Sequence, residues 1–73
     1  MVKIKLIGGL KRKLGFDEKE FSIDQPTPLR DLLDLSLDDD RLVILINETS
    51  GGKLDTIIKN EDYIMISPVF GGG

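Results

Sequence analysis

The first residues of the chain alternate between apolar and charged side chains. In the stretch Val2–Ile7, Lys3 and Lys5 separate the apolar positions. This period of two is typical of a β-strand with one buried face and one exposed face. We therefore predict a first strand over residues 2–7.

A basic segment and a second strand follow the glycine pair at positions 8 and 9. Leu10–Leu14 has the composition of one or two helical turns, and Gly15 is placed to end them in a left-handed conformation. Apolar residues then flank a charged run between Phe16 and Ile23. We predict a second strand there, with a polar bend or an exposed start.

The clearest boundary in the pattern is Thr27-Pro28. A hydroxyl residue able to cap a helix precedes a proline, which is favoured at the first helical position because its missing N–H costs nothing there. Leucines then recur at the spacing of one helical face: Leu29, Leu32 and Leu33. We predict a short helix from Pro28 to about Leu35 that packs on a sheet.

The second half of the chain contains two apolar strands. They are predicted over residues 41–47 and 62–67, with a glycine-rich hairpin turn over 47–52 and a short strand within 53–58. Asp38–Asp40 forms a polar loop that lacks the alternating ligands and the glycine of a calcium loop.

This order of elements predicts an α+β fold of the β-grasp type. One main helix crosses a mixed sheet of four to five strands, because a single helix cannot cover both faces of a sheet. The first and last strands then lie parallel in the centre. We expect one β-grasp domain over residues 1–70 and a flexible glycine tail over residues 71–73.

The uncovered face of this sheet is a candidate interface. Leu42–Ile46 and Ile64–Ile66 offer apolar side chains to both sides of the sheet. One set packs on the helix, and the other either forms an exposed patch of the kind that marks a protein interface or lies under loops.

Composition excludes several kinds of chemistry. The chain has no histidine and no cysteine, so the commonest general base, the commonest metal ligand and the thiol nucleophile are missing. We expect no catalytic residue, no metal site and no bound cofactor. A net charge of −3 has the wrong sign for a nucleic-acid binder. The alternating start and the absence of a long apolar run indicate a cytoplasmic protein without a membrane segment.

The end of the chain carries the candidate chemistry. Ser67-Pro68-Val69-Phe70 leads into Gly71-Gly72-Gly73. Glycine lets another backbone approach closely, so this tail can enter a channel that any Cβ would block. By elimination, the carboxylate of Gly73 is the candidate reactive group.

The order of elements, the Asn60-Glu61-Asp62 turn and Pro68-Val69 before the glycines resemble the ubiquitin-like sulfur carriers over essentially the whole chain. These are the small subunit of molybdopterin synthase and the thiamine-biosynthesis carrier. The resemblance implies that a ubiquitin-activating-type adenylyltransferase consumes ATP to adenylate the terminal glycine, which then becomes a thiocarboxylate.

The same resemblance assigns roles to individual residues. Gly73 is the site of adenylation and thiocarboxylate formation, and Gly71 and Gly72 are the spacer. Four residues are expected to contact partners: Ile66, Pro68, Val69 and Phe70. The expected partners are the adenylyltransferase and the large subunit of molybdopterin synthase or another sulfur-accepting enzyme, so the chain is a carrier co-substrate or non-catalytic subunit.

The chain departs from the family in two places. Gly73 is one residue more than the usual diglycine, which leaves Gly72 and Gly73 both open as the functional terminus. Gly8-Gly9 stands where the family has an aromatic and a small residue. The Leu10–Leu14 insertion resembles the molybdopterin type more than the thiamine type.

Two other functions remain open at this point. The same activated carboxylate would allow a ubiquitin-like modifier to form isopeptide bonds with target lysines. The chain could also be a β-grasp binding module with a non-functional tail. The sulfur acceptor, whether a pterin, a thiazole, a tRNA base or a protein, and the oligomeric state are likewise open.

Overall fold

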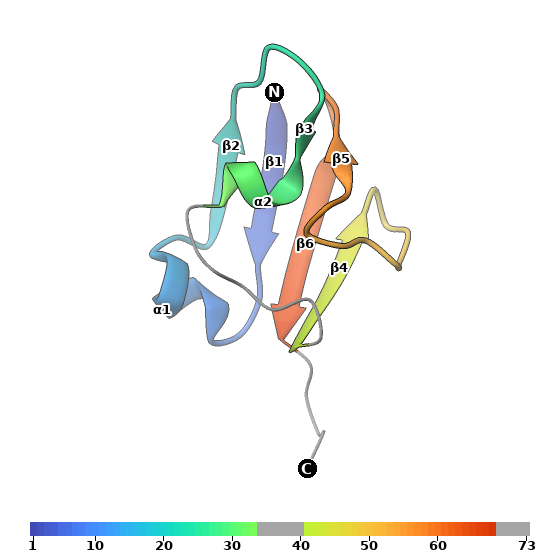
Figure 1. Ribbon diagram of the computed structural model, residues 1–73. Coiled ribbons are helices and arrows are strands. Elements are labelled where there is room, and N and C mark those ends of the chain that lie inside the picture. Colours follow the sequence, from blue (N-terminus) through green and yellow to red (C-terminus); the bar gives the residue numbers. More distant parts are fainter. Residues whose placement is uncertain (34–40, 69–73) are drawn as a thin grey trace.

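The computed structural model describes residues 1–33 and 41–68 of the chain. A four-stranded sheet has the order β2-β1-β6-β4, as Figure 1 shows. Its strands are β1 (Val2–Leu6), β2 (Glu18–Phe21), β4 (Leu42–Ile46) and β6 (Tyr63–Pro68). A separate two-stranded sheet pairs β3 (Thr27–Pro28) with β5 (Ile57–Ile58), and the helices are α1 (Leu10–Leu14) and α2 (Leu29–Leu32).

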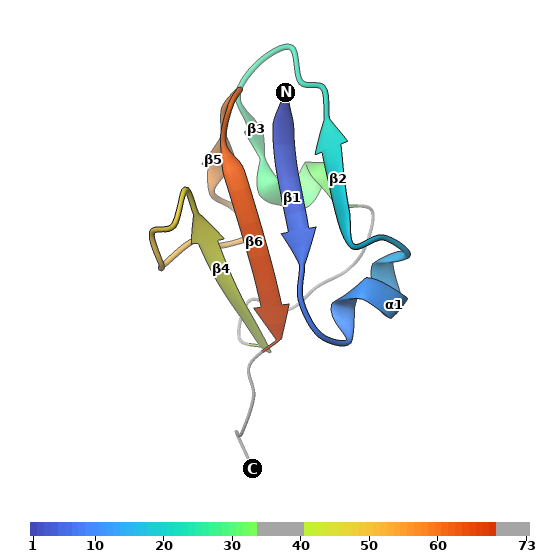
Figure 2. The ribbon, with the colours of Figure 1, turned by 180° about the vertical axis from the view of Figure 1, so that it is seen from behind.

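The first and last strands lie parallel in the centre of the larger sheet. β1 pairs with β6 in parallel, with Ile4 opposite Ile64, while β2 and β4 are antiparallel edge strands. Helix α2 lies over one face of the sheet, and the opposite face is turned toward the viewer in Figure 2. This arrangement confirms the predicted β-grasp fold.

The core lies between the sheet and α2. Apart from Leu29 of α2, its fully buried side chains come from alternate positions of the strands, as a pleated strand requires. The buried apolar residues are Val2, Ile4, Leu6, Leu10, Leu29, Leu33, Ile44, Leu54, Ile58, Ile64 and Ile66. Helix α2 supplies only Leu29 to this set, and Leu33 follows directly after its last turn.

The predicted helix begins at the wrong residue. Pro28 is extended, with ψ 141°, and α2 runs only from Leu29 to Leu32. Thr27 does not cap it, because its hydroxyl donates to the carbonyl of Gln25 at 2.8 Å. The residues 34–40, which include the predicted helix end and the acidic loop, lie outside the described residues.

Long-range hydrogen bonds explain this correction. Thr27 and Pro28 pair with β5, which holds them extended. The first helical N–H groups, which a capping side chain normally satisfies, donate instead to carbonyls of the segment before β5. Leu29 N–H reaches Thr56 and Arg30 N–H reaches Leu54, both at 2.9 Å.

Two local predictions are confirmed. Gly15 has φ +85°, and its N–H donates to the carbonyl of Lys11, so it ends α1 in the left-handed conformation. A hairpin turn also follows β4 as predicted, but it is shorter than the expected stretch 47–52: it consists of Asn47 and Glu48, both at positive φ, and Ile46 pairs with Thr49 across it.

Candidate functional site

Most of the predicted site lies beyond the part of the chain that the structure describes. Val69, Phe70 and the glycines at 71–73 belong to the undescribed residues. Pro68 is described: it is half-buried, ends β6 and stands opposite Leu42 of β4. The described chain therefore stops at the end of the sheet that lies opposite Met1 (Figure 1).

The prediction that Ile66 contacts partners is wrong for this fold. Its side chain is 0% exposed and belongs to the core. The cause is the period of two along β6: Ile66 lies on the helix side with Ile64, and it stands opposite the buried Ile44 of β4. The side chain of Ile66 packs in the core between the sheet and α2, so it offers no surface to a partner.

The side chains that do face outward on this half of the sheet occupy the intervening positions. The larger ones are Val43 and Leu45 on β4 and Tyr63 and Met65 on β6, which together we call the apolar half of the open face. Leu45 stands directly opposite Met65, and Val43 is 42% exposed. Val43, Leu45 and Met65 lie within the stretches from which the sequence predicted an apolar set on the uncovered face, but the sequence did not assign which residues face outward, and Tyr63 was not included.

The other half of the open face is charged. Lys3 and Lys5 project from β1, and each stands opposite a glutamate of β2: Lys3 opposite Glu20, and Lys5 opposite Glu18. Opposite charges at directly facing positions favour this strand pairing. We call these four residues the charged half of the open face.

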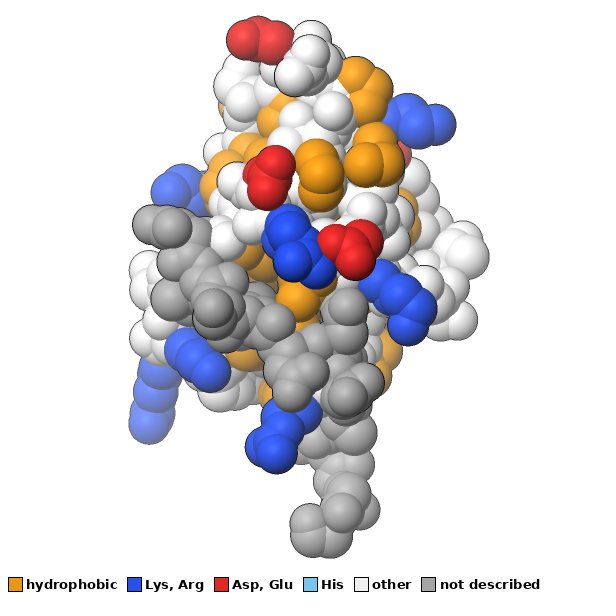
Figure 3. Space-filling view, in the orientation of Figure 1, with side chains coloured by type: hydrophobic (Ala, Val, Ile, Leu, Met, Phe, Trp, Pro, Cys, Tyr) orange, Lys and Arg blue, Asp and Glu red, His pale blue; other side chains and the backbone are white. Residues whose placement is uncertain are grey.

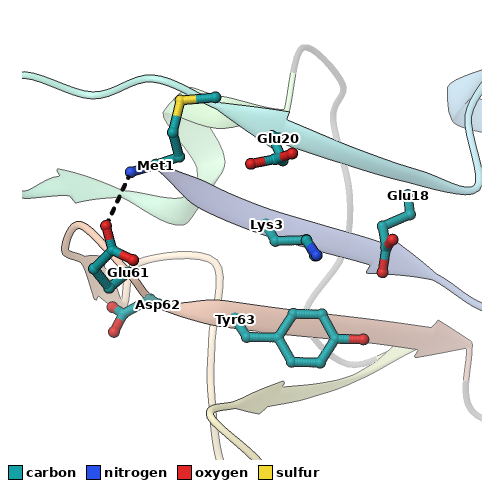
Figure 4. A pocket seen from close by; sticks show the side chains of 7 residues that line it. All are labelled: Met1, Lys3, Glu18, Glu20, Glu61, Asp62 and Tyr63. Atoms are coloured by element: carbon teal, nitrogen blue, oxygen red, sulfur yellow. Dashed lines mark hydrogen bonds and ion pairs between the residues drawn. The ribbon is translucent and has the colours of Figure 1, made fainter.

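A shallow depression of about 530 Å³ lies over the charged half of the open face, next to Met1 and the turn before β6. Figure 4 shows its lining: Met1, Lys3, Glu18, Glu20, Glu61, Asp62 and Tyr63. The amino nitrogen of Met1 lies 3.4 Å from Glu61 Oε1. Within residues 1–33 and 41–68, no group of three or more acidic, histidine or cysteine side chains is arranged to hold a metal ion.

A polar clamp joins the turn after β4 to the turn before β6. Asn47 Nδ2 donates to Asp62 Oδ1 at 2.9 Å, and the N–H of Tyr63 donates to Asn47 Oδ1 at 2.8 Å. Asp62 Oδ2 also accepts the N–H of Lys59 at 2.8 Å. These bonds fix the start of β6, so the strand that leads to the tail is anchored at its far end.

Comparison with known proteins rests on structure. No protein-family model and no curated protein matches the sequence. Among solved structures, SAMP1 from Haloferax volcanii superposes with a TM-score of 0.73 at 20% identity, over 99% of this chain and 98% of that one.

The fold is ubiquitin-like. The superposition spans both chains almost completely, so the whole domain and not one motif is shared. At this identity the similarity concerns the fold, and it agrees with the sequence-based resemblance to that extent. No helix within the described residues has the length and apolar character needed to span a membrane.

Proposed function

We propose that this protein is a sulfur carrier whose terminal glycine, Gly73, is adenylated and converted to a thiocarboxylate, which donates sulfur in molybdenum cofactor biosynthesis or a related pathway. Two findings support the proposal. The fold is ubiquitin-like over its whole length, and the sequence after Pro68 ends in three glycines. Small domains of this fold are typically non-catalytic, which suits a co-substrate acted on by other enzymes.

The position of β6 is the observation that carries the proposal. It is a central strand, bonded to β1 on one side and β4 on the other, and the Asn47–Asp62 clamp fixes its start. Residues 69–73 follow its end, and five fully extended residues span at most about 17 Å. A tail of this length would let Gly73 enter a partner's channel while the folded domain docks on the partner's surface.

The chemistry follows from the carboxylate. Its oxygen attacks the α-phosphorus of ATP and pyrophosphate leaves, which gives an acyl adenylate. A persulfide of the partner displaces AMP, and a thiol then cleaves the S–S bond of the acyl disulfide and leaves the thiocarboxylate on the glycine. This chain has no cysteine, so both sulfur nucleophiles come from the partner enzymes.

We further propose that the apolar half of the open face docks on these partners, together with Pro68, Val69 and Phe70 near the tail. Apolar side chains at the centre of an interface usually dominate its binding energy. Val43 is the most exposed of the apolar half. Val43→Asp is therefore expected to weaken binding to the adenylyltransferase while leaving the fold intact.

The tail itself is tested by Gly72→Ala. A Cβ there blocks entry into a narrow channel, so ATP–pyrophosphate exchange by the cognate enzyme should fall at least about tenfold, which corresponds to about 1.4 kcal/mol of transition-state stabilisation. Gly9→Ala is the matched control, because a Cβ at Gly9 meets nothing within 4 Å. An unchanged rate of ATP–pyrophosphate exchange with the Gly72→Ala variant would contradict the proposal.

A second candidate is protein modification, which the ubiquitin-like fold also supports. The same acyl adenylate, passed to a partner thiol, can acylate the amine of a target lysine. Isopeptide-linked conjugates of this chain in lysate, without a thiocarboxylate, would favour the modifier. Full function after deletion of residues 71–73 would instead favour a binding module whose tail has no role.

A further inference from the structure

The outer edge of β2 is a second candidate binding site, on the side of the sheet away from β4. Glu18, Lys19 and Glu20 are all exposed, and β2 is the end strand of the sheet. The N–H of Leu6 donates to the carbonyl of Asp17 at 2.8 Å. Because hydrogen-bonded pairs alternate along antiparallel strands, Lys19 bonds to β1, and the backbone groups of Glu18 and Glu20 point outward.

An apolar groove of about 300 Å³ runs beside this edge on the helix-covered side. Its apolar lining comes from Leu14, Phe16, Phe21, Leu32 and Leu33, and the exposed Lys13 and Lys19 complete it. The rings of Phe16 and Phe21 pack edge to face at 6.2 Å, and Lys19 Nζ lies within 6 Å of both centroids, at 5.8 and 5.4 Å.

The charged side chains that line the groove, within the part of the chain that the structure describes, are both basic: Lys13 and Lys19. Among the described residues, Lys11 is paired with Asp17 at 3.5 Å, whereas no described acid forms an ion pair with Lys13 or Lys19. Figure 3 shows that the coloured charged side chains in the lower half of this face belong to Lys and Arg. On the opposite side of the strand, Glu18 and Glu20 are the outermost charges.

We propose that the edge of β2 accepts an added β-strand from a partner protein. On the groove side, that strand carries apolar side chains around an acidic one opposite Lys19. On the open face it carries basic side chains opposite Glu18 and Glu20. Main-chain hydrogen bonds supply the contact, and the alternating side chains supply the selectivity. This site is separate from the tail and does not depend on the proposed sulfur chemistry.

The inner neighbour of β2 shows that this pattern fits. On β1, Lys3 and Lys5 stand opposite Glu20 and Glu18, and Ile4 stands opposite Lys19 on the groove side. A strand added outside repeats this arrangement, with an acid in place of Ile4, because Lys19 is exposed and forms no ion pair with an acid among the described residues.

A second copy of this chain fits poorly at the same edge. If two β2 strands pair antiparallel about Lys19, Lys19 faces its own copy and Glu18 faces Glu20, so the three central facing pairs all carry like charges. Like charges directly opposite one another destabilise strand pairing. Charged side chains commonly protect edge strands in this way, and here they exclude self-pairing while leaving a complementary strand admissible.

The test is a titration of the ¹⁵N-labelled protein with a capped peptide, Thr-Val-Lys-Glu-Lys-Ile-Thr. Its central Glu faces Lys19 and its two Lys face Glu18 and Glu20. We expect the amides of Glu18 and Glu20 to shift and to gain protection from hydrogen exchange. The amide of Lys19 should gain little, because it is already bonded to β1.

The matched control is the charge-swapped peptide Thr-Val-Glu-Lys-Glu-Ile-Thr, which should bind at least about tenfold more weakly because three facing pairs become repulsive. The variant Lys19→Glu should shift the preference toward a peptide with Lys at the centre. Equal binding of both peptides, shifts confined to the apolar half of the open face, or no shift at Glu18 and Glu20 would each overturn the proposal.

Discussion

The two edges of the sheet differ in how their backbone is satisfied. At the β4 edge, Ile46 exchanges two hydrogen bonds of 2.9 Å with Thr49, and the N–H of Gly52 donates to the carbonyl of Ile44 at 3.1 Å. The chain thus folds back and closes this edge itself. At the β2 edge, the outward groups of Glu18 and Glu20 have no strand beside them among the described residues.

The side chains follow the same division. The apolar half of the open face lies beside the closed edge, and the charged half lies beside the open one. At β4, the carbonyl of Ile44 and both outward groups of Ile46 are already bonded within the chain, which favours contact with a partner through side chains. At β2 a partner can use the backbone, with charges that select the strand. One small sheet thereby offers two different kinds of binding surface.

Substitutions at two adjacent residues of β4, one on each face of the sheet, should differ most in their effect on stability. Ile44 is 3% exposed and Val43 is 42% exposed. Ile44→Ala is expected to lower the free energy of unfolding by about 2–4 kcal/mol through lost burial and a cavity, whereas Val43→Ala should cost less than about 1 kcal/mol. Urea denaturation measures both, and similar losses would contradict the assignment of faces.

Opening the closed edge is the next test. A Cβ on Gly52 would lie 2.7 Å from Ile44 Cγ2 and 2.9 Å from Ile46 Cγ1, so Gly52→Ala should destabilise the domain by about 1–3 kcal/mol and speed amide exchange along β4. In Gly9→Ala, where the space is open, stability should stay within about 0.5 kcal/mol. Equal behaviour of the two variants would show that the edge is not packed as described.

The clamp that holds β4 and β6 together should contribute less. Asn47→Gly removes the bonds to Asp62 and Tyr63 but tolerates φ +50°, so the expected loss is about 1–2 kcal/mol. Glu48→Gly is the control: at φ +70° glycine relieves strain and should stabilise by about 0.5–1 kcal/mol. Thermal unfolding of both variants measures these changes in stability. A loss of stability in Glu48→Gly would show that Glu48 has a stabilising role in the turn that outweighs the strain.

The open edge should show the smallest effect on stability. Lys19 and Glu20 are exposed, so a double change, Lys19→Thr with Glu20→Thr, should alter the free energy of unfolding by less than about 1 kcal/mol. Because it removes the like-charge opposition, the variant should self-associate in sedimentation experiments as concentration rises. A variant that stays monomeric would show that these charges do not guard the edge.

The sequence was informative where burial alternates. Val2–Ile7 and the last strand were predicted to within a residue or two, because apolar and polar positions alternate or cluster there. Glu18–Phe21 contains three charged residues in a row, which leaves no alternation from which to read its register. The start of α2 was missed because Thr27 and Pro28 follow a local capping pattern that long-range pairing with β5 overrides.

Some features of the candidate site can likewise be read from the sequence, whereas others require the fold. The glycine tail is visible in the sequence alone, whereas the role of Ile66 required the sheet, since only the register with Ile44 shows which face it occupies. The edge of β2 and its groove were not predicted at all. They depend on the order of strands and on the approach of Leu32 and Leu33 to Phe21, which no local pattern encodes.

The most direct test of the sulfur-carrier proposal is intact-protein mass spectrometry of material from its own cells, before and after treatment with iodoacetamide. Because the chain has no cysteine, a thiocarboxylate would be its one readily alkylated sulfur, which also distinguishes it from oxidation of Met1 or Met65. We expect one terminal oxygen to be replaced by sulfur and a single alkyl group to be added to the C-terminal fragment. A terminal carboxylate without sulfur and without label, in cells that are actively synthesising the cofactor, would contradict it.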